Sequence, residues 1–231
     1  MITLPAGTYE PLYSSDPKRD VPAFRLDVCP VTNGEFLQFV RDNPAWRRSQ
    51  VKRIFADDGY LSHWADDLEP GPKAPMDSPV SHVSWFAARA YAEALGLRLP
   101  TLAEWEYAAA VPAGSTTELA RILAWYGKPS QEPLPPVRST FATAHGVWDL
   151  HGLVWEWVED FNTALVTGES RGDSALDQSL FCGGGAANAA EFRDYAAFMR
   201  YALRGSLAGA YTMANLGFRC AADVSREENT P

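Results

Sequence analysis

The sequence is short of the residues that build disulfide frameworks, metal sites and membrane spans. Its 231 residues include only three cysteines and four histidines. Cys29, Cys182 and Cys220 match no CxxC metal pattern and can form at most one disulfide. No apolar run approaches the roughly 20 residues that a helix needs to cross a bilayer, so we expect no membrane span.

Positive charge is also scarce. Lys and Arg number 20 against 29 for Asp and Glu, which gives a net charge of -9. Such a surface repels phosphate backbones, so nucleic acid is excluded as the expected partner. No basic and then apolar leader opens the chain. We therefore expect a periplasmic or secreted protein if a signal was removed, and a cytoplasmic one otherwise.

What the chain does contain is enough apolar side chain for one core. It is 46% hydrophobic and 12% aromatic, and 17 glycines and 17 prolines are scattered along it. Scattered glycine and proline indicate many turns and long loops, with little regular structure. We expect one α+β domain over residues 1–224, followed by a flexible polar tail over residues 225–231.

Four helices are predicted, two of them from T-x-x-E capping boxes. Thr32 with Glu35 and Thr101 with Glu104 can each satisfy the free backbone N–H groups at a helix start. Ser84 predicts a helix over residues 85–95 that Gly96 ends. Apolar residues spaced by three or four predict another helix over residues 191–203. Short strands are expected at residues 24–28, 179–182 and 217–221, and a loop at residues 112–136.

Four blocks of the sequence resemble the family of formylglycine-generating enzymes, also called sulfatase-modifying factors. The blocks are residues 30–36 (PVTNGEF), residues 79–85 with 98–107 (PVSHVSW and RLPTLAEWEY), residues 146–157 (GVWDLHGLVWEW) and residues 215–221 (NLGFRCA). They follow one another in the family's order. The resemblance implies a C-type-lectin-like fold that is poor in regular structure, with small antiparallel sheets and a few short helices.

The family's own reaction is not expected here. Its members oxidise a sulfatase cysteine with copper held by two thiolates, which lie a few residues beyond a strand that reads roughly Arg-Gly-Gly-Ser. The matching strand here reads Cys182-Gly183-Gly184-Gly185, and no cysteine follows between Gly185 and Arg200. Because Cu(I) prefers soft thiolate ligands, the loss of both removes the copper site. We assign no catalytic residue.

A calcium site of the family is predicted to remain. The resemblance places its ligands at Asp149, Gly152, Val154 and Glu156, as two carboxylates and two backbone carbonyls. Calcium accepts six to eight oxygen ligands in a flexible geometry. The alternative is that Asp149 and Glu156 bond loop amides and hold no ion.

A candidate binding cleft follows from the same resemblance. The family's tryptophan equivalent to Trp155 lines a peptide cleft, whereas the alternative for Trp155 is a place in the core. We expect Trp148 and Trp157 to be core residues. The candidate cleft comprises Trp155, Asn188, Arg193, Asn215 and Cys182.

The leading functional hypothesis is a binding or accessory (maturation) protein that holds a protein or peptide partner. Similarity to bacterial members that accompany copper nitrite reductases suggests a link to copper enzymes. One alternative is a toxin-immunity protein. Another is a copper- or iron-dependent oxidase or oxygenase with a rearranged site at Cys182, Cys220 or a histidine.

Histidine and cysteine spacing bear on the oxidase alternative. His63, His82, His145 and His151 include no pair at helical spacing, so we expect structural histidines, although a copper or iron site built across the fold is left open. The family also resembles iron-dependent sulfoxide synthases, whose metal-binding histidines lie largely in a separate domain. We expect Cys220 to be buried and reduced, and Cys182 to be the more reactive thiol.

Overall fold

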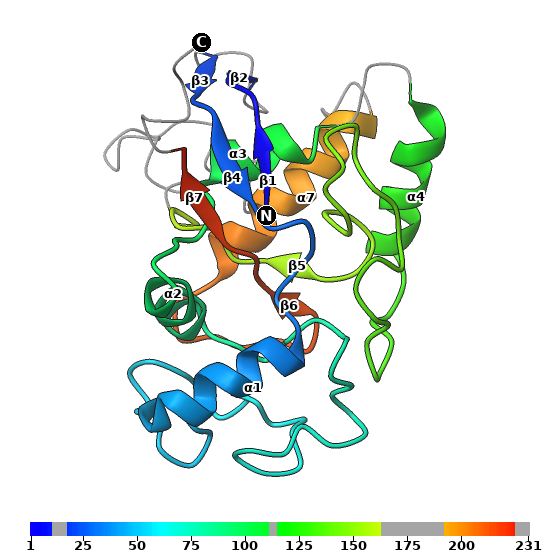
Figure 1. The fold of residues 1–231 in the computed structure, drawn as a ribbon. Helices are drawn as coiled ribbons and strands as arrows, with labels where there is room; N and C mark the ends of the chain where they lie inside the picture. Colours follow the sequence, from blue (N-terminus) through cyan, green and yellow to red (C-terminus); the bar gives the residue numbers. More distant parts are fainter. Residues whose placement is uncertain (11–17, 111–114, 163–191, 225–231) are drawn as a thin grey trace, which may run out of the picture.

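The computed structural model describes residues 1–10, 18–110, 115–162 and 192–224 of the chain, with the side chains of residues 192–195 excepted. In these ranges short strands and helices are joined by long loops (Figure 1). The architecture is α+β with small sheets, as the sequence predicted. None of the helices in the described ranges is both long and apolar enough to cross a membrane.

A three-stranded antiparallel sheet joins the first and last strands of the described chain. β4 (Phe24–Leu26) lies between β1 (Ile2–Leu4) and β7 (Ala221–Asp223). The register places Leu26 opposite Ile2 on one side and Ala221 on the other. A separate antiparallel pair, β2 (Gly7–Tyr9) with β3 (Arg19–Val21), extends from the same region. The predicted strand at residues 24–28 is therefore confirmed, in shorter form.

The third sheet is a parallel ladder of two residues on each strand. β5 (Trp155–Glu156) pairs with β6 (Leu216–Gly217). The sequence predicted only antiparallel sheets, so the parallel pairing is a correction. The predicted strand over residues 217–221 is likewise divided between β6 and β7. The strand expected at residues 179–182 lies outside the described residues.

The three helices that follow Thr32, Ser84 and Thr101 begin where the capping signals predicted, and the described chain has six helical segments in all. They are α1 (Asn33–Asp42), the 3-10 helix η1 (Pro44–Trp46), α2 (Trp85–Ala94), α3 (Leu102–Ala108), α4 (Thr116–Tyr126) and α7 (Phe192–Ser206). Both capping boxes are formed, at Thr32 with Glu35 and at Thr101 with Glu104. The Ser84 hydroxyl accepts from the backbone N–H of Ala87. The predicted helix over residues 191–203 is confirmed as α7.

The prediction of a loop over residues 112–136 is wrong, because α4 lies within it. This helix buries only Ile122 in the core. One buried position in eleven residues gives a weak helical period, which explains why the pattern was not detected. In Figure 1 the helix stands at the right edge of the molecule, beside the loop that leads to β5.

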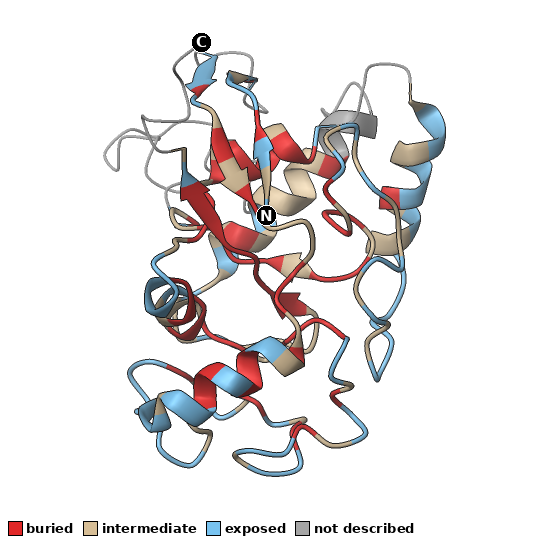
Figure 2. Ribbon diagram, in the orientation of Figure 1, coloured by how far each residue is buried: buried red, intermediate tan, exposed pale blue. Residues whose placement is uncertain are grey.

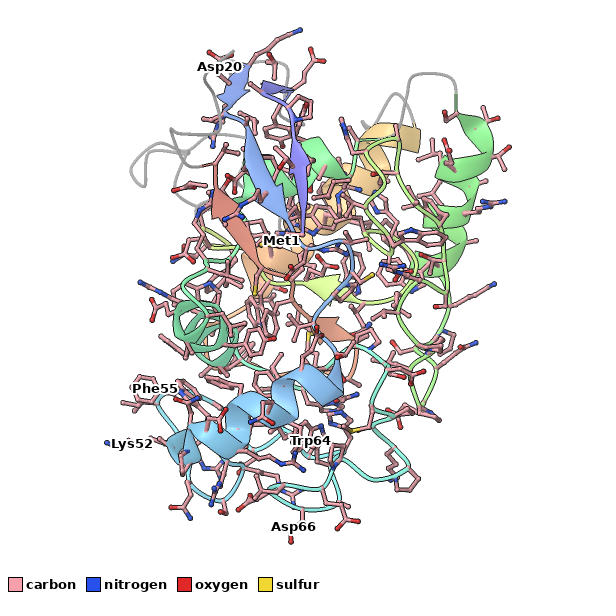
Figure 3. All side chains as sticks on the ribbon, viewed as in Figure 1. Met1, Asp20, Lys52, Phe55, Trp64 and Asp66 are labelled. Carbon is pink, nitrogen blue, oxygen red and sulfur yellow. The ribbon has the colours of Figure 1, made fainter. Side chains whose placement is uncertain are left out.

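The core runs between β7, β6 and the helices around them, where Figure 2 shows nearly continuous burial. Aromatic rings fill much of it: Phe36 stacks on Tyr91 at 5.7 Å between centroids, and Phe218 meets Tyr91 edge-on at 5.3 Å. Trp157 is buried, as predicted, whereas Trp148 is only half-buried. In Figure 3 Trp64 lies against α1, where its indole N–H donates to the Asn33 side chain.

Candidate functional site

The β5–β6 ladder fixes the position of Trp155, the central residue of the candidate cleft. The Trp155 backbone N–H donates to the Asn215 carbonyl at 2.7 Å, and Trp157 repeats this bond to Gly217 at 3.0 Å. Two residues of the predicted cleft, Trp155 and Asn215, are thus brought together. Arg193 lies in α7, but its side chain is outside the described residues, and so are Asn188 and Cys182.

Two aromatic side chains of α4 pack against Trp155. The ring of Tyr126 stacks on Trp155 with centroids 4.8 Å apart and planes at 18°, and the ring of Trp125 lies at 4.8 Å and 42°. All three side chains are only partly buried. The helix that the sequence missed therefore supplies part of a half-exposed aromatic surface around Trp155.

A narrow pocket opens beside this aromatic surface, and we call it the Trp155 pocket. Its wall includes Trp155, Tyr126, His151, Glu156, Arg200 and Arg204. These side chains come from α4, α7 and the segment around β5. The pocket therefore combines an apolar rim with several ionisable groups.

Glu106, from α3, holds two arginines of this wall. Arg200 donates to the carboxylate at 2.6 Å and Arg204 at 2.7 Å, and all three side chains are almost fully buried. Burial alone raises the pKa of Glu106, but the charges and hydrogen bonds of Arg200 and Arg204 outweigh it and lower the pKa to about 2. Arg200 also donates to the Tyr126 hydroxyl at 3.2 Å, which links α7 to α4.

The buried imidazole of His151 is part of the same pocket wall. Its side chain is 2% exposed, and Nε2 lies 2.9 Å from the Ala109 carbonyl. Because a carbonyl can only accept, Nε2 carries the proton and Nδ1 is an acceptor. Within the described chain Nδ1 is buried without a hydrogen-bond partner. Burial, helped by the charge of Arg200, lowers the pKa of His151 to about 4, so the ring is neutral at pH 7.

Glu156 forms a second buried ion pair behind the pocket. Arg219 donates to both of its oxygens, at 2.7 and 2.8 Å, and Trp105 donates through Nε1 at 2.7 Å. Both charged side chains are completely buried. Arg219 further donates to the backbone carbonyls of Asp27 and Trp148. The guanidinium thus ties β5 to segments far away in the sequence.

Asp149, the other carboxylate of the predicted calcium site, is bonded to a neighbouring loop. It accepts from the backbone N–H of Arg138, and from the backbone N–H of Thr140 at 3.0 Å and its hydroxyl at 2.7 Å. The alternative of loop-amide bonds therefore describes Asp149, whereas Glu156 is bonded to a guanidinium instead. The described residues contain no cluster of three or more His, Cys, Asp or Glu side chains suited to a metal ion. Calcium at Asp149, Gly152, Val154 and Glu156 stays a prediction.

Two histidines that are 19 positions apart in the sequence meet in a separate small pocket. The rings of His63 and His82 stack at 4.4 Å between centroids, and Glu132 contributes to the same wall. Burial first, and then the neighbouring charges of His82 and Arg48, lower the pKa of His63 to about 3. No helical spacing could reveal this pair, because both residues lie in loops.

The cysteines agree with the expectation as far as they are described. Cys220 is a buried free thiol, and burial, followed by the charge of Asp27, raises its pKa well above the usual range. Cys29 is free and half-buried, 3.4 Å from the Arg138 guanidinium. The reactivity predicted for Cys182 concerns a residue outside the described chain.

Several residues of the Trp155 pocket were missed by sequence reasoning. Arg200 lies on the helix predicted over residues 191–203 and Arg204 follows directly after that range, so their spacing of four is a usable signal once the helix is extended by one residue. Glu106 lies within a block that the resemblance explained as structural. Its pairing with α7 spans more than ninety positions, so no local pattern could indicate it.

Comparison with known proteins identifies the family. Residues 1–224 match the model of the sulfatase-modifying factor enzyme 1-like domain. The formylglycine-generating enzyme of Streptomyces coelicolor is 34% identical over a match that covers 87% of this chain and 78% of that protein. The inactive C-alpha-formylglycine-generating enzyme 2 of Bos taurus is 30% identical, with 68% and 69% covered.

Other relatives are named for functions other than formylglycine generation. Hercynine oxygenase of Mycobacterium tuberculosis is 35% identical over 60% of this chain, but the match spans only 38% of that longer protein. Among solved structures, PvdO from Pseudomonas aeruginosa has a TM-score of 0.53 at 20% identity, with 96% and 93% of the two chains covered, which shows the shared fold. From the family match over residues 1–224 and the conserved architecture, we conclude that the chain belongs to the sulfatase-modifying factor enzyme 1-like family.

Proposed function

We propose that this domain is a non-oxidising member of the family that binds a protein or peptide partner at the Trp155 pocket. The observation that carries the proposal is a contrast between two parts of the chain. The stretch after Gly185 lacks both cysteines that the family's copper chemistry uses, whereas the pocket retains an accessible aromatic surface beside buried ionisable groups. Loops on a rigid scaffold readily change their role once catalytic residues are lost.

The relatives support a binding role without naming the partner. The bovine relative is described as an inactive enzyme of the same family, so loss of the oxidase reaction occurs within it. An accessory role in the maturation of copper enzymes such as nitrite reductase, and a role as a toxin-immunity protein, both fit a domain that binds and does not oxidise. Both remain proposals.

The first test is the family's own reaction. We expect no aldehyde product when the full chain is incubated with a Cys-x-Pro-x-Arg peptide and oxygen, with or without added copper, because no thiolate pair follows Gly185 to hold the metal. Mass spectrometry of the peptide checks this. The formylglycine-generating relative of Streptomyces coelicolor is the positive control. Catalytic turnover to the aldehyde would overturn the proposal.

A metal-dependent oxygenase is the second candidate, and two observations favour it. Relatives that act as hercynine oxygenases match 60% of the chain. The fold also brings two imidazoles, those of His63 and His82, into one pocket, where no third His, Cys, Asp or Glu of the described residues completes a metal-binding group. Neutral imidazole is a good ligand for iron or copper. Stoichiometric iron or copper that survives dialysis, measured by elemental analysis, would support this candidate over the binding protein.

Calcium is the cofactor that we propose for the loop around Asp149 and Glu156. We expect that thorough chelation lowers the melting temperature and that added calcium restores it, since a ligand present at a hundredfold excess over its Kd adds about 2.7 kcal/mol to the stability of the folded state. A melting curve that chelation leaves unchanged would assign both carboxylates to hydrogen bonding and ion pairing alone. Magnesium at the same concentration serves as the control for general ionic effects.

A further inference from the structure

Four partly exposed aromatic rings form a continuous row of contacts where η1 and the start of α2 meet. The ring centroids of Trp46 and Phe55 are 6.0 Å apart, and those of Phe55 and Phe86 are 5.5 Å apart. Trp85 continues the row at 5.3 Å from Phe86. Phe55 is 37% exposed, and Ile54 beside it, at 71%, is the most exposed large apolar residue of those that the structure describes. We call these five residues the Phe55 surface, and a contiguous apolar surface of this kind indicates an interaction site.

The turn that carries Ile54 and Phe55 is anchored on both sides. The Phe55 backbone N–H donates to the Lys52 carbonyl at 2.8 Å, and Ala56, the next residue, is fully buried. Beyond it, the Asp57 backbone N–H donates at 2.9 Å to a carbonyl in the turn after α7. The two apolar side chains are therefore held at the surface by the fold, and a partner that covers them does not have to order the turn first.

Basic residues gather beside this surface, although the protein as a whole is acidic. Five of the 20 Lys and Arg residues lie between positions 41 and 53, against a single Asp, in a chain whose net charge is -9. Arg48 donates to two backbone carbonyls and Arg53 is paired with Asp58. Lys52 is exposed and forms no ion pair in the described ranges, and Figure 3 shows it at the same edge of the molecule as Phe55. A complementary partner carries negative charge at this edge.

The spacing of the rings fits one face of a helix. Side chains three or four positions apart on an α-helix have Cβ atoms about 5 to 6 Å apart, and neighbouring rings of the row are separated by a similar interval. An amphipathic helix can place such residues against an apolar surface of a partner. An anionic membrane fits less well, because the exposed Asp66 and Asp67 lie in the next loop, where Asp67 accepts from the Ser49 backbone N–H, and a flat bilayer would meet both signs of charge.

We propose that the Phe55 surface is a docking site for an amphipathic helix of a partner protein, with large apolar side chains of that helix against the aromatic row and an Asp or Glu beside Lys52. No residue of this surface lines the Trp155 pocket. The inference therefore goes beyond the function proposed for that pocket and does not depend on it.

Three matched peptides test the proposal on the full chain. The first is an N-acetylated, C-amidated helical peptide of about five turns, with Leu and Phe at positions spaced by three and four and with Glu and Gln elsewhere. The second has Lys in place of every Glu, and the third has Ser in place of every Leu and Phe. We expect the first peptide to bind about tenfold or more tightly than either of the others, because it alone supplies both the apolar face and the negative charge. Fluorescence anisotropy of the labelled peptides measures the dissociation constants.

Two pairs of variants locate the binding. Ile54→Asp should weaken binding of the first peptide about tenfold, and its fold should persist because Ile54 is largely exposed. Leu95→Asp makes the same kind of change at a 57% exposed residue directly after α2 and should bind as the wild type does. Lys52→Glu should reverse the preference, so that the Lys peptide binds more tightly than the Glu peptide, which damage to the fold alone cannot produce. Lys128→Glu, at an exposed position after α4, is its control and should keep the preference.

The proposal is overturned if the Glu and Lys peptides bind the wild type equally, if the Ser peptide binds as tightly as the first, or if Lys52→Glu leaves the preference unchanged. Loss of binding in Lys128→Glu alone would move the peptide to the aromatic residues near the Trp155 pocket. Binding to phosphatidylserine vesicles that Ile54→Asp abolishes, without binding of the first peptide, would assign the surface to a membrane instead. Circular dichroism verifies that each variant is folded. Aldehyde formation in the oxidase test would contradict the proposed function without changing any of these measurements.

Discussion

Replacing Glu156 by glutamine is expected to lower the free energy of unfolding by about 3 to 5 kcal/mol, because the change leaves a charged guanidinium buried without its partner. Arg219 has no exposed side-chain surface, and Glu156 accepts two of its hydrogen bonds. A glutamine side chain has the same shape and can still accept the hydrogen bond from Trp105. The decrease in the free energy of unfolding therefore measures mainly the loss of the negative charge. Urea denaturation followed by circular dichroism measures it.

A double variant separates the charge effect from the loss of packing. Glu156→Leu combined with Arg219→Met removes both charges and keeps most of the apolar volume, and we expect it to be more stable than Glu156→Gln alone. A double variant that is less stable than the single one would show that the Arg219 bonds to the backbone of Asp27 and Trp148 dominate. Performing both measurements with a chelator present keeps any calcium effect out of the comparison.

Replacing Glu106 by glutamine is expected to have an effect of similar size, about 3 to 5 kcal/mol, because two buried guanidinium groups then lose their shared carboxylate. Glu106 accepts hydrogen bonds from Arg200 and Arg204, and together with the Trp105 ring, which both guanidinium groups approach, it joins α3 to α7. We also expect α7 to become less protected from hydrogen exchange than α1, which makes no contact with this ion network.

The control for Glu106 is a carboxylate on an exposed helix face. Glu93 forms an i,i+4 pair with Arg89 on α2, with both side chains about half exposed. Glu93→Gln should change the free energy of unfolding by less than about 0.5 kcal/mol, because exposed pairs are screened by water. If Glu106→Gln were as mild as this control, the buried network would not stabilise the attachment of α7.

The elements that the sequence predicted are those whose signals are local. Thr32 and Glu35 are three residues apart, and their mutual hydrogen bonds depend on little beyond the first helical turn. Ser84 and Gly96 mark the ends of α2 in the same local way. Family resemblance then supplied the overall architecture, including the proximity of Trp155 and Asn215, which no local pattern contains.

The parts that escaped prediction depend on distant contacts. α4 packs its Trp125 and Tyr126 against Trp155, about thirty positions away, and has only one side chain in the core. The β5–β6 ladder is two residues long, which is too short for an alternating pattern to appear. Ion pairs such as Glu106 with Arg200 join helices that are separated by most of the chain, so their partners could not be assigned from sequence.

The antiparallel sheet also determines the order in which the molecule can assemble. β4 can pair with β1 as soon as both have been synthesised, but its partner on the other edge, β7, lies nearly two hundred residues later in the chain. Closing a contact of such long sequence separation is slow compared with forming helices or local turns. We therefore expect that the edge of β4 is available to other chains until β7, which ends at Asp223, has been synthesised and can cover it.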